Sequence, residues 1–309
     1  MSSGEFPIVV QGLTKRYGRA RQVWALRDVS LTIQPGIFGL LGRNGAGKTT
    51  LLQILATLLA PTSGSAKIGP YDTRRQRWEI RPHLGYLPQE HGFYPALTVT
   101  ETLRYFAALQ NLAQPTMAIG RALEAVNLGE KAQARVAALS GGMRRRLGLA
   151  QVLLGDPAVL IVDEPTAGLD PVEQQRFRTL LGTLGADGRR TVILSTHVVA
   201  DIASAARRVA VLERGRLAFD GGVSELRARA QGQTWEWRAT LTQVEAARVN
   251  PDVIVTAVTP TEQTAHDGTP LVIARAVGAQ PAPDASGREP TLEDGYFMLL
   301  GKDAADVAN

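Results

Sequence analysis

The stretch GRNGAGKTT, residues 42–50, decides the fold of this chain. It fits the pattern G-x-x-x-x-G-K-[ST], and it stands between an apolar run at 36–41 and an amphipathic helical pattern that begins near Lys48. Gly42, Gly45 and Gly47 allow successive backbone N–H groups to turn inward around phosphate oxygens, and the helix start adds the positive end of a dipole. The stretch therefore predicts a buried strand, a phosphate-binding loop and a helix that together hold a nucleotide.

Two side chains of this phosphate loop (residues 42–50) carry specific expectations. Lys48 is expected to reach the β- and γ-phosphates of a nucleoside triphosphate, and the Thr49 hydroxyl is expected to ligate Mg²⁺. The rest of the predicted nucleotide-binding set is Arg43, Asn44, Ala46 and Thr50.

Polar side chains end two further apolar runs. VLIV at 159–162 is followed by Asp163 and Glu164, and TVILS at 191–195 precedes His197. Such near-continuous apolar runs are typical of parallel strands that are covered on both faces, and ligands bind at the carboxyl edge of such sheets. We expect Asp163 to support Mg²⁺ through water and Glu164 to act as the general base on the attacking water. His197 is expected to contact the γ-phosphate.

The segment LSGGM, residues 139–143, interrupts a helical region. Ser140 has the character of a helix N-cap, and Gly141 and Gly142 expose bare backbone that can approach a charged group closely. Asp170, followed by Pro171, is likewise a helix cap, alongside any functional role.

Over residues 6–225 the chain resembles the nucleotide-binding subunit of an ATP-binding cassette (ABC) transporter. The motifs that carry the resemblance occur in the family's order: Tyr17 in KRYG, the phosphate loop, Gln89 in GYLPQ, LSGGM, the Asp163-Glu164 pair, GLD at 168–170, and His197. Two positions depart from the family pattern, since Arg43 replaces a proline and Met143 replaces a glutamine.

The resemblance implies roles that the residues alone do not. Tyr17 would stack on the adenine of ATP, and Gln89 would sense Mg²⁺ and the γ-phosphate. Asp170 would link the two sites of a dimer. Ser140, Gly141 and Gly142 would meet the γ-phosphate of ATP held by the other subunit, so that a homodimer, or a pair of ABC subunits, sandwiches two ATP molecules.

The expected fold class is α/β. The resemblance implies a P-loop NTPase core with a mostly parallel sheet, an antiparallel β subdomain, and an inserted helical subdomain at about 90–157. A hairpin is expected around 214–215. The residue pattern changes after about 230, where Trp235 and Trp237 alternate with polar residues. This change predicts a small C-terminal α/β or β-rich accessory domain over 230–309. That domain would regulate, stabilise the dimer, or form a passive extension.

Composition narrows the class of function. The chain has no cysteine, which excludes disulfides and thiolate chemistry, and its four histidines lack metal-ligand spacing. The net charge of +5 fits a solvated surface, so no nucleic acid partner is expected. No apolar run is long enough to span a membrane, and the N-terminus lacks signal-peptide features. The protein is therefore expected in the cytoplasm, peripheral at the cytoplasmic face of the membrane.

Among ABC proteins, a transport motor fits best. Only about 50 residues separate Gln89 from Leu139, too few for the coiled coil of a chromosome-structural ATPase. One phosphate loop argues against a two-cassette translation factor, and no Asn-Lys-x-Asp motif supports a GTPase. The resemblance is greatest to exporters of drugs, antibiotics, lipids or polymers, with an importer motor as the alternative. Such a motor would dock on a separate membrane permease through residues near 90–110, with 95–101 the nearest.

Overall fold

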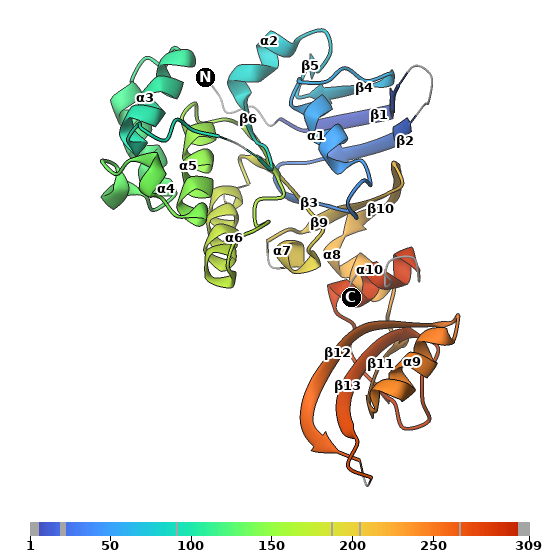
Figure 1. The fold of residues 1–309 in the computed structure, drawn as a ribbon. Helices are drawn as coiled ribbons and strands as arrows, with labels where there is room; N and C mark the ends of the chain where they lie inside the picture. The colour runs from blue at the N-terminus through green and yellow to red at the C-terminus, as the bar shows by residue number, and fades with distance from the viewer. Residues whose placement is uncertain are drawn as a thin grey trace. The chain divides into compact units, whose positions relative to one another are not determined.

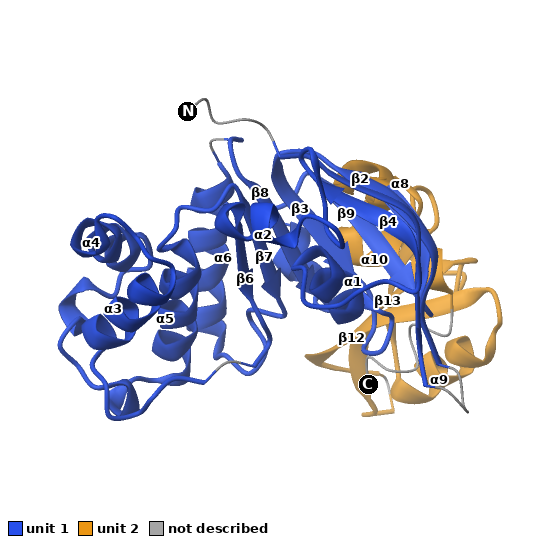
Figure 2. Ribbon diagram, turned by 90° about the horizontal axis from the view of Figure 1, so that it is seen from above, with its two compact units in different colours: residues 1–220 blue, residues 221–309 orange. Residues whose placement is uncertain are grey.

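The computed structural model describes residues 6–18, 23–90, 92–186, 188–203, 205–265 and 267–301. Two compact units divide the chain, residues 1–220 and residues 221–309 (Figure 2). The first unit contains two sheets and most of the helices, and the second contains a sheet of its own.

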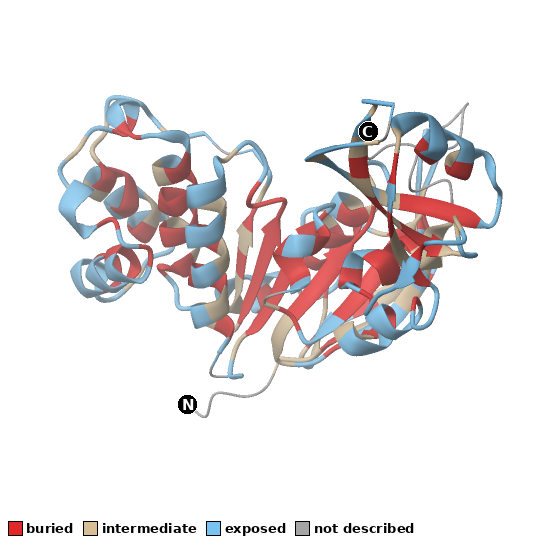
Figure 3. Ribbon diagram, turned by 90° about the horizontal axis from the view of Figure 1, so that it is seen from below, coloured by how far each residue is buried: buried red, intermediate tan, exposed pale blue. Residues whose placement is uncertain are grey.

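A six-stranded sheet with the order β10-β9-β3-β8-β7-β6 forms the centre of the first unit (Figure 1). Its strands from β6 to β9 are parallel to one another. β7 and β8 are buried along their whole length, as Figure 3 shows, which confirms the expectation from the apolar runs. The strands are β3 (Gly36–Leu41), β6 (Leu84–Leu87), β7 (Val159–Asp163), β8 (Thr191–Thr196), β9 (Arg208–Glu213) and β10 (Arg216–Gly222).

Helices cover both faces of this sheet. Phe38 and Leu40 of β3 pack in the core that contains α1, whereas a Cβ on the intervening Gly39 would collide with Ile202 of α7. The alternation follows from the pleat, which sends successive side chains to opposite faces. The helices here are α1 (Lys48–Leu55), α6 (Pro171–Gly185) and α7 (Val199–Ala203).

An antiparallel sheet with the order β2-β1-β4-β5 lies on the other side of α1, which contacts β2, β4 and β7. The expected alternation appears in β2, where Val29, Leu31 and Ile33 are buried and the residues between them are exposed. The antiparallel β subdomain is thus confirmed. Its strands are β1 (Ile8–Tyr17), β2 (Val23–Ile33), β4 (Ser63–Ile68) and β5 (Tyr71–Asp72), and the short α2 (Arg77–Ile80) follows them.

Three helices, drawn in green in Figure 1, form a group beside α6: α3 (Val99–Leu109), α4 (Pro115–Ala125) and α5 (Gly141–Leu153). Short 3₁₀ turns stand at Arg81–His83, Gly129–Lys131 and Val136–Ala138. The first helix of the group begins at a capping box, in which the Glu101 N–H donates to Thr98 Oγ1 at 3.1 Å and the Thr98 N–H donates to Glu101 Oε2 at 2.8 Å.

Local turn chemistry sets two boundaries. The hairpin between β9 and β10 turns at Arg214 and Gly215, both with positive φ, as a type I′ turn requires. The leucine pattern after Lys48 predicts a helix as far as Pro61, but α1 ends at Leu55. The chain turns at Thr57, whose φ is 61°, and leaves Leu58 exposed. Helical periodicity alone could not reveal that turn.

In the residues of the second unit that the structure describes, an antiparallel sheet of order β12-β13-β11-β14 is accompanied by three helices. Trp237 anchors its core together with valines and alanines of the neighbouring strands. An ion pair joins Arg275 Nη2 to the buried Asp294 Oδ2 at 2.6 Å. The elements are α8 (Val223–Ala228), β11 (Thr234–Ala239), α9 (Leu241–Val249), β12 (Val253–Thr264), β13 (Pro270–Gly278), β14 (Ser286–Gly287) and α10 (Leu292–Leu300). Its accessory role stays a prediction.

Candidate nucleotide-binding and hydrolysis site

The phosphate loop connects β3 to α1, and its glycines are required for two separate reasons. Gly45 and Gly47 have φ of 79° and 105°, in the left-handed region that glycine enters without a steric penalty. Gly42 lies so close to β9 that an added Cβ would stand 2.5 Å from the Leu212 carbonyl oxygen. Close approach to phosphate is the reason expected from the sequence. Packing against the chain's own backbone is a second reason that the sequence did not reveal.

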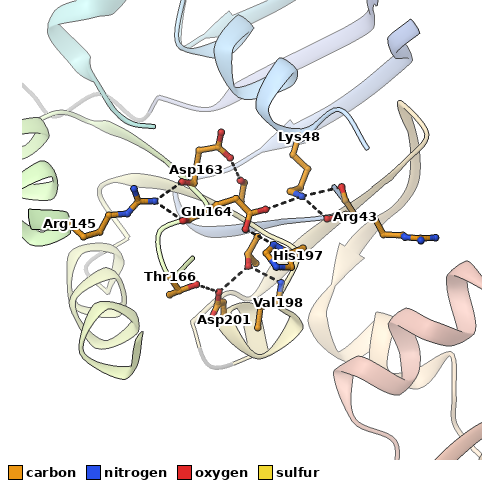
Figure 4. Close-up of polar contacts among 12 residues, drawn as sticks. Arg43, Lys48, Arg145, Asp163, Glu164, Thr166, His197, Val198 and Asp201 are labelled. Atoms are coloured by element: carbon orange, nitrogen blue, oxygen red, sulfur yellow. Dashed lines mark hydrogen bonds and ion pairs between the residues drawn. The ribbon is translucent and has the colours of Figure 1, made fainter. Parts of the chain in front are cut away.

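Lys48 is buried at the start of α1, and its side chain reaches back to the beginning of the phosphate loop. Its Nζ donates to the carbonyl oxygens of Gly42, at 2.6 Å, and Arg43, at 3.3 Å. The same nitrogen pairs with Glu164 Oε1 at 3.0 Å, and the two side chains are each only 6% exposed (Figure 4). The cation predicted to hold phosphate therefore already contacts the predicted general base.

The end of β7 sends two adjacent carboxylates in different directions. Asp163 is the last strand residue and is fully buried; Ser195 Oγ donates to its Oδ1, while Oδ2 has no hydrogen-bond partner among the described residues. Glu164 adopts φ of 47°, a conformation that is uncommon outside glycine and frequent where active sites store strain. The left-handed turn brings Glu164 toward Lys48 instead of continuing the alternation of the strand.

His197 follows β8 and completes this set of contacts. Its Nδ1 lies 2.7 Å from Glu164 Oε2, and its ring is 45% exposed. The phosphate loop, β7 and β8 thus bring together three residues that the sequence pointed to separately. Lys48, Glu164 and His197 meet at the carboxyl edge of the parallel strands, where an α/β sheet binds its ligands. The arrangement defines a nucleotide-binding site of the phosphate-loop type with a carboxylate beside it.

The buried ion pair predicts a stability effect. Lys48→Met leaves the Glu164 charge buried with only the half-exposed His197 beside it, and we expect a loss of about 3 kcal/mol in the free energy of unfolding. The double variant Lys48→Met/Glu164→Gln removes both charges and should recover most of that loss. Urea unfolding of the wild type, of Lys48→Met, of Glu164→Gln and of the double variant measures the coupling. Equal losses in the single and double variants would contradict the pairing.

Asp201 is a supporting residue that the sequence analysis missed. It is fully buried, and its Oδ2 accepts hydrogen bonds from Thr166 Oγ1 at 2.6 Å and Thr196 Oγ1 at 3.0 Å. Arg178 of α6 pairs with its Oδ1. Asp201 thereby ties the segment after Glu164 to the residue before His197. The available signal was a single acidic residue within the apolar stretch VVADIA at 198–203.

Other predicted residues lie at the edges of this arrangement. Tyr17 ends β1 and is half exposed, with Lys15 Nζ 5.2 Å from its ring centroid. Gln89 is exposed in the loop after β6, and Thr49 is exposed in the first turn of α1. Asp170 Oδ1 accepts from the Glu173 N–H at 2.9 Å, which confirms its capping of α6. Their nucleotide-related roles stay predictions.

Residues 139–143 form the capped start of α5, with Ser140 Oγ accepting from the Met143 N–H at 3.2 Å. The two glycines of this segment differ. A Cβ on Gly141 would meet nothing within 4 Å, so its face is open. A Cβ on Gly142 would stand 2.5 Å from Glu173 Oε2 of the same chain. The sequence predicts that the backbone at Gly142 approaches a charged group closely. In the folded chain, one group that it approaches is the Glu173 carboxylate of the same chain.

This difference predicts unequal effects of two alanine substitutions. Gly142→Ala should destabilise the folded chain by about 1–3 kcal/mol, because Glu173 must move away from its arginine partners to admit the methyl group. Gly141→Ala is the matched control, and it should change the stability by less than about 1 kcal/mol, since its methyl group would meet nothing within 4 Å. Thermal unfolding of the nucleotide-free chain tests both. If the two variants lower Tm equally, the contact with Glu173 does not explain the loss of stability.

Several known proteins are similar to this chain. The family model described as "ABC transporter" matches residues 26–167. The Nod factor export ATP-binding protein I of Paraburkholderia xenovorans (strain LB400) is 40% identical, over 74% of this chain and 75% of that protein. The daunorubicin resistance ATP-binding protein DrrA3 of Streptomyces coeruleorubidus is 32% identical, over 96% of each chain. ABC transporter A family member 8 of Dictyostelium discoideum is 34% identical, but this chain spans only 28% of its length.

A solved structure, a bacterial ABC transporter cassette described as dimeric, superposes with a TM-score of 0.61 at 25% identity, covering 70% of this chain and 98% of that one. The chain therefore belongs to the ABC transporter family, as one of its ATP-binding subunits. It is an ATPase with the P-loop NTPase core expected from the sequence. None of the helices in the part of the chain that the structure describes is long and apolar enough to cross a membrane.

Proposed function

We propose that the chain is the ATP-hydrolysing motor of an exporter and works as a head-to-tail dimer on a separate membrane permease. The observation that carries the hydrolytic part is the contact of Glu164 with both Lys48 and His197 at the edge of the parallel sheet. The direction of transport is supported by the relatives whose names specify export or drug resistance, and these relatives do not favour the importer motor that the sequence left as the alternative.

Each residue of the site has one task in this proposal. Lys48 turns from the Glu164 carboxylate to the β- and γ-phosphates of ATP. Glu164 then accepts a proton from the attacking water as the water oxygen bonds to the γ-phosphorus, while the bond from that phosphorus to the bridging oxygen breaks and ADP leaves. His197 contacts the γ-phosphate from the end of β8. Tyr17 stacks on adenine, and the backbone of the phosphate loop, residues 42–50, surrounds the phosphates.

Mg²⁺ fits the donors available here. Asp163 Oδ2 is a buried carboxylate oxygen without a protein partner in the described part of the chain, and Thr49 offers an exposed hydroxyl on the adjacent helix. Within the described ranges, no three His, Cys, Asp or Glu side chains gather into a cage. This fits a cation that is held by few carboxylates together with substrate phosphates. Asp163, Thr49 and Gln89 would hold the ion, which neutralises developing charge on the phosphates.

The dimer follows from what one chain offers at the start of α5. Ser140 is exposed, the Gly141 face is open, and the helix N-terminus provides N–H groups that favour an anion. In the proposed dimer, Ser140, Gly141 and Gly142 meet the γ-phosphate of ATP on the partner, while Asp170 lies between the two sites. Two symmetric copies of this contact give an isologous dimer with two ATP molecules.

The permease is proposed to dock near the start of α3. Tyr94 and Tyr105 are exposed there and meet edge to face at 6.1 Å, next to the Phe93–Phe106 pair. Exposed aromatic side chains are the ones that interfaces use most strongly. Residues 95–101 lie between Tyr94 and the part of α3 that carries Tyr105 and Phe106. Docking at this surface would hold the chain at the cytoplasmic face of the membrane.

Co-purification with the permease encoded nearby tests this function. Tyr94→Ser/Tyr105→Ser should weaken the binding about tenfold or more, because truncated interface aromatics carry much of the binding energy. Met117→Ser, which replaces an exposed apolar residue of α4, is the control and should bind normally. ATPase activity that is stimulated by nucleic acid and indifferent to any permease would overturn the proposal.

A further inference from the structure

Arg145, in the second turn of α5, is buried and is surrounded by backbone oxygen. Among the described residues, five carbonyl groups accept its hydrogen bonds: Pro165 from Nε at 3.1 Å, Asp163 and Glu164 from Nη2 at 3.1 and 2.6 Å, Pro88 from Nη1 at 3.2 Å, and Gln89 from Nη1. Burial lowers the pKa of this arginine, while the nearby Asp163 and Glu164 charges oppose that shift.

These acceptors belong to two separate segments of the site. Pro88 and Gln89 follow β6, whereas Asp163 ends β7 and is followed by Glu164 and Pro165 (Figure 4 shows the contacts to Asp163 and Glu164). A guanidinium offers five N–H donors in a rigid plane, so one side chain can hold both segments at a fixed distance. Because backbone oxygens accept the bonds, Arg145 fixes where the main chain of the general base lies, whatever the Glu164 side chain does.

The helix that carries Arg145 begins at the segment that faces the partner in the proposed dimer. Ser140 caps α5, and Arg145 stands five residues further along the same helix. An α-helix is stiff over such a distance, so a displacement of its N-terminus moves Arg145 with it. The guanidinium then pulls on the backbone of Glu164 and of Gln89 together.

We propose that Arg145 is a positioning residue that couples the placement of α5 to the placement of Glu164 and Gln89. The inference rests on the proposed function, in which Glu164 is the base and the start of α5 meets ATP of the partner. Loss of Arg145 leaves nucleotide binding intact and slows hydrolysis, because a shift of about 1 Å in a catalytic group can cost about 10²-fold in rate.

The neighbouring Arg146 provides a matched control. It is equally buried on the same helix, but its Nη1 donates to the carbonyl groups of Val126 and Asn127, and its Nε pairs with Glu173 at 3.4 Å. Replacing it removes buried contacts with two carbonyl groups and one carboxylate, and it leaves the segments after β6 and β7 untouched. Arg145→Lys and Arg146→Lys keep the charge, whereas Arg145→Gln and Arg146→Gln remove it.

Steady-state kinetics, nucleotide affinity and thermal unfolding of these four variants test the proposal. We expect Arg145→Lys and Arg145→Gln to lower kcat about tenfold and about 10²-fold, while the ATP Kd stays within about threefold. Arg146→Lys and Arg146→Gln should lower Tm comparably, with kcat within about threefold of the wild type.

Two results would overturn the coupling. In the first, kcat falls in proportion to the loss of Tm, and by the same amount in the Arg145 and Arg146 variants. In the second, the Arg145 variants have a raised ATP Kd and an unchanged kcat. If Arg145→Gln does not fold, Arg145→Lys carries the comparison. Failure of the wild-type chain to hydrolyse ATP at all would instead reject the proposed function.

Discussion

Replacing Glu164 by glutamine should reduce ATP hydrolysis by about 10²–10⁴-fold, the usual contribution of a general base, while ATP still binds. The amide keeps the shape of the side chain and its place between Lys48 and His197, but it cannot accept a proton from water. The substitution also frees Lys48 from a buried counter-ion, which leaves its full charge for phosphate. Phosphate release and nucleotide affinity, measured on the same preparation, separate these effects.

An ATP-bound dimer should accumulate in that variant, because the dimer reopens only after hydrolysis in the proposed cycle. Size-exclusion chromatography with and without ATP detects it. Asp156→Asn is a suitable control, since it neutralises a carboxylate that pairs with Arg190 at 2.6 Å away from the site, and it should hydrolyse ATP normally. A Glu164→Gln protein that cannot bind ATP would show that Glu164 holds the nucleotide and is not the base.

The main features of the core could be predicted because the evidence for them is local in the sequence. An apolar run, three glycines and Lys48 stand within fifteen residues, and they specify β3, the phosphate loop and α1. The continuous apolar runs before Asp163 and His197 identify β7 and β8 in the same way, since only strands covered on both faces tolerate them. Parallel strands then place their ends on one edge, so the meeting of Glu164 and His197 follows from the topology.

Features that depend on contacts between distant segments could not be predicted. Arg145 stands in a run of three arginines, which is typical of a solvated surface, yet it is buried against carbonyl groups as far away as Pro88. Asp201 pairs with Thr166, 35 residues earlier. A Cβ added at Gly142 would collide with Glu173 only because α5 packs against the start of α6. In each case tertiary packing determines the partner, and no local pattern in the sequence predicts it.

The turn at Glu164 lies between these two cases. The sequence allowed both carboxylates to face the nucleotide at the strand end, without saying how. The structure shows that the left-handed conformation of Glu164 itself turns the two side chains apart, so that Asp163 lies among buried groups and Glu164 reaches Lys48. Left-handed conformations of non-glycine residues are uncommon, and the residue type alone does not predict one.

Mixed dimers give the sharpest test of the sandwich arrangement. Ser140→Arg places a large cation where Ser140 and Gly141 would meet the partner's γ-phosphate, and Lys48→Met disables the phosphate loop of its own chain. In a head-to-tail dimer, each ATP lies between the phosphate loop of one subunit and residues 139–143 of the other. The two substitutions therefore affect one site or both, according to how they are distributed between the subunits.

The decisive measurement is the amount of ATP occluded by mixed dimers with the substitutions in separate subunits or in the same subunit. Placed in separate subunits, the two changes fall in the same site and leave the other site intact, so the dimer should still occlude ATP. Placed together in one subunit beside a wild-type partner, they damage both sites, and occlusion should be lost. The reverse result, with ATP occluded only when both changes share a subunit, would show that each chain builds its site alone and would contradict the account.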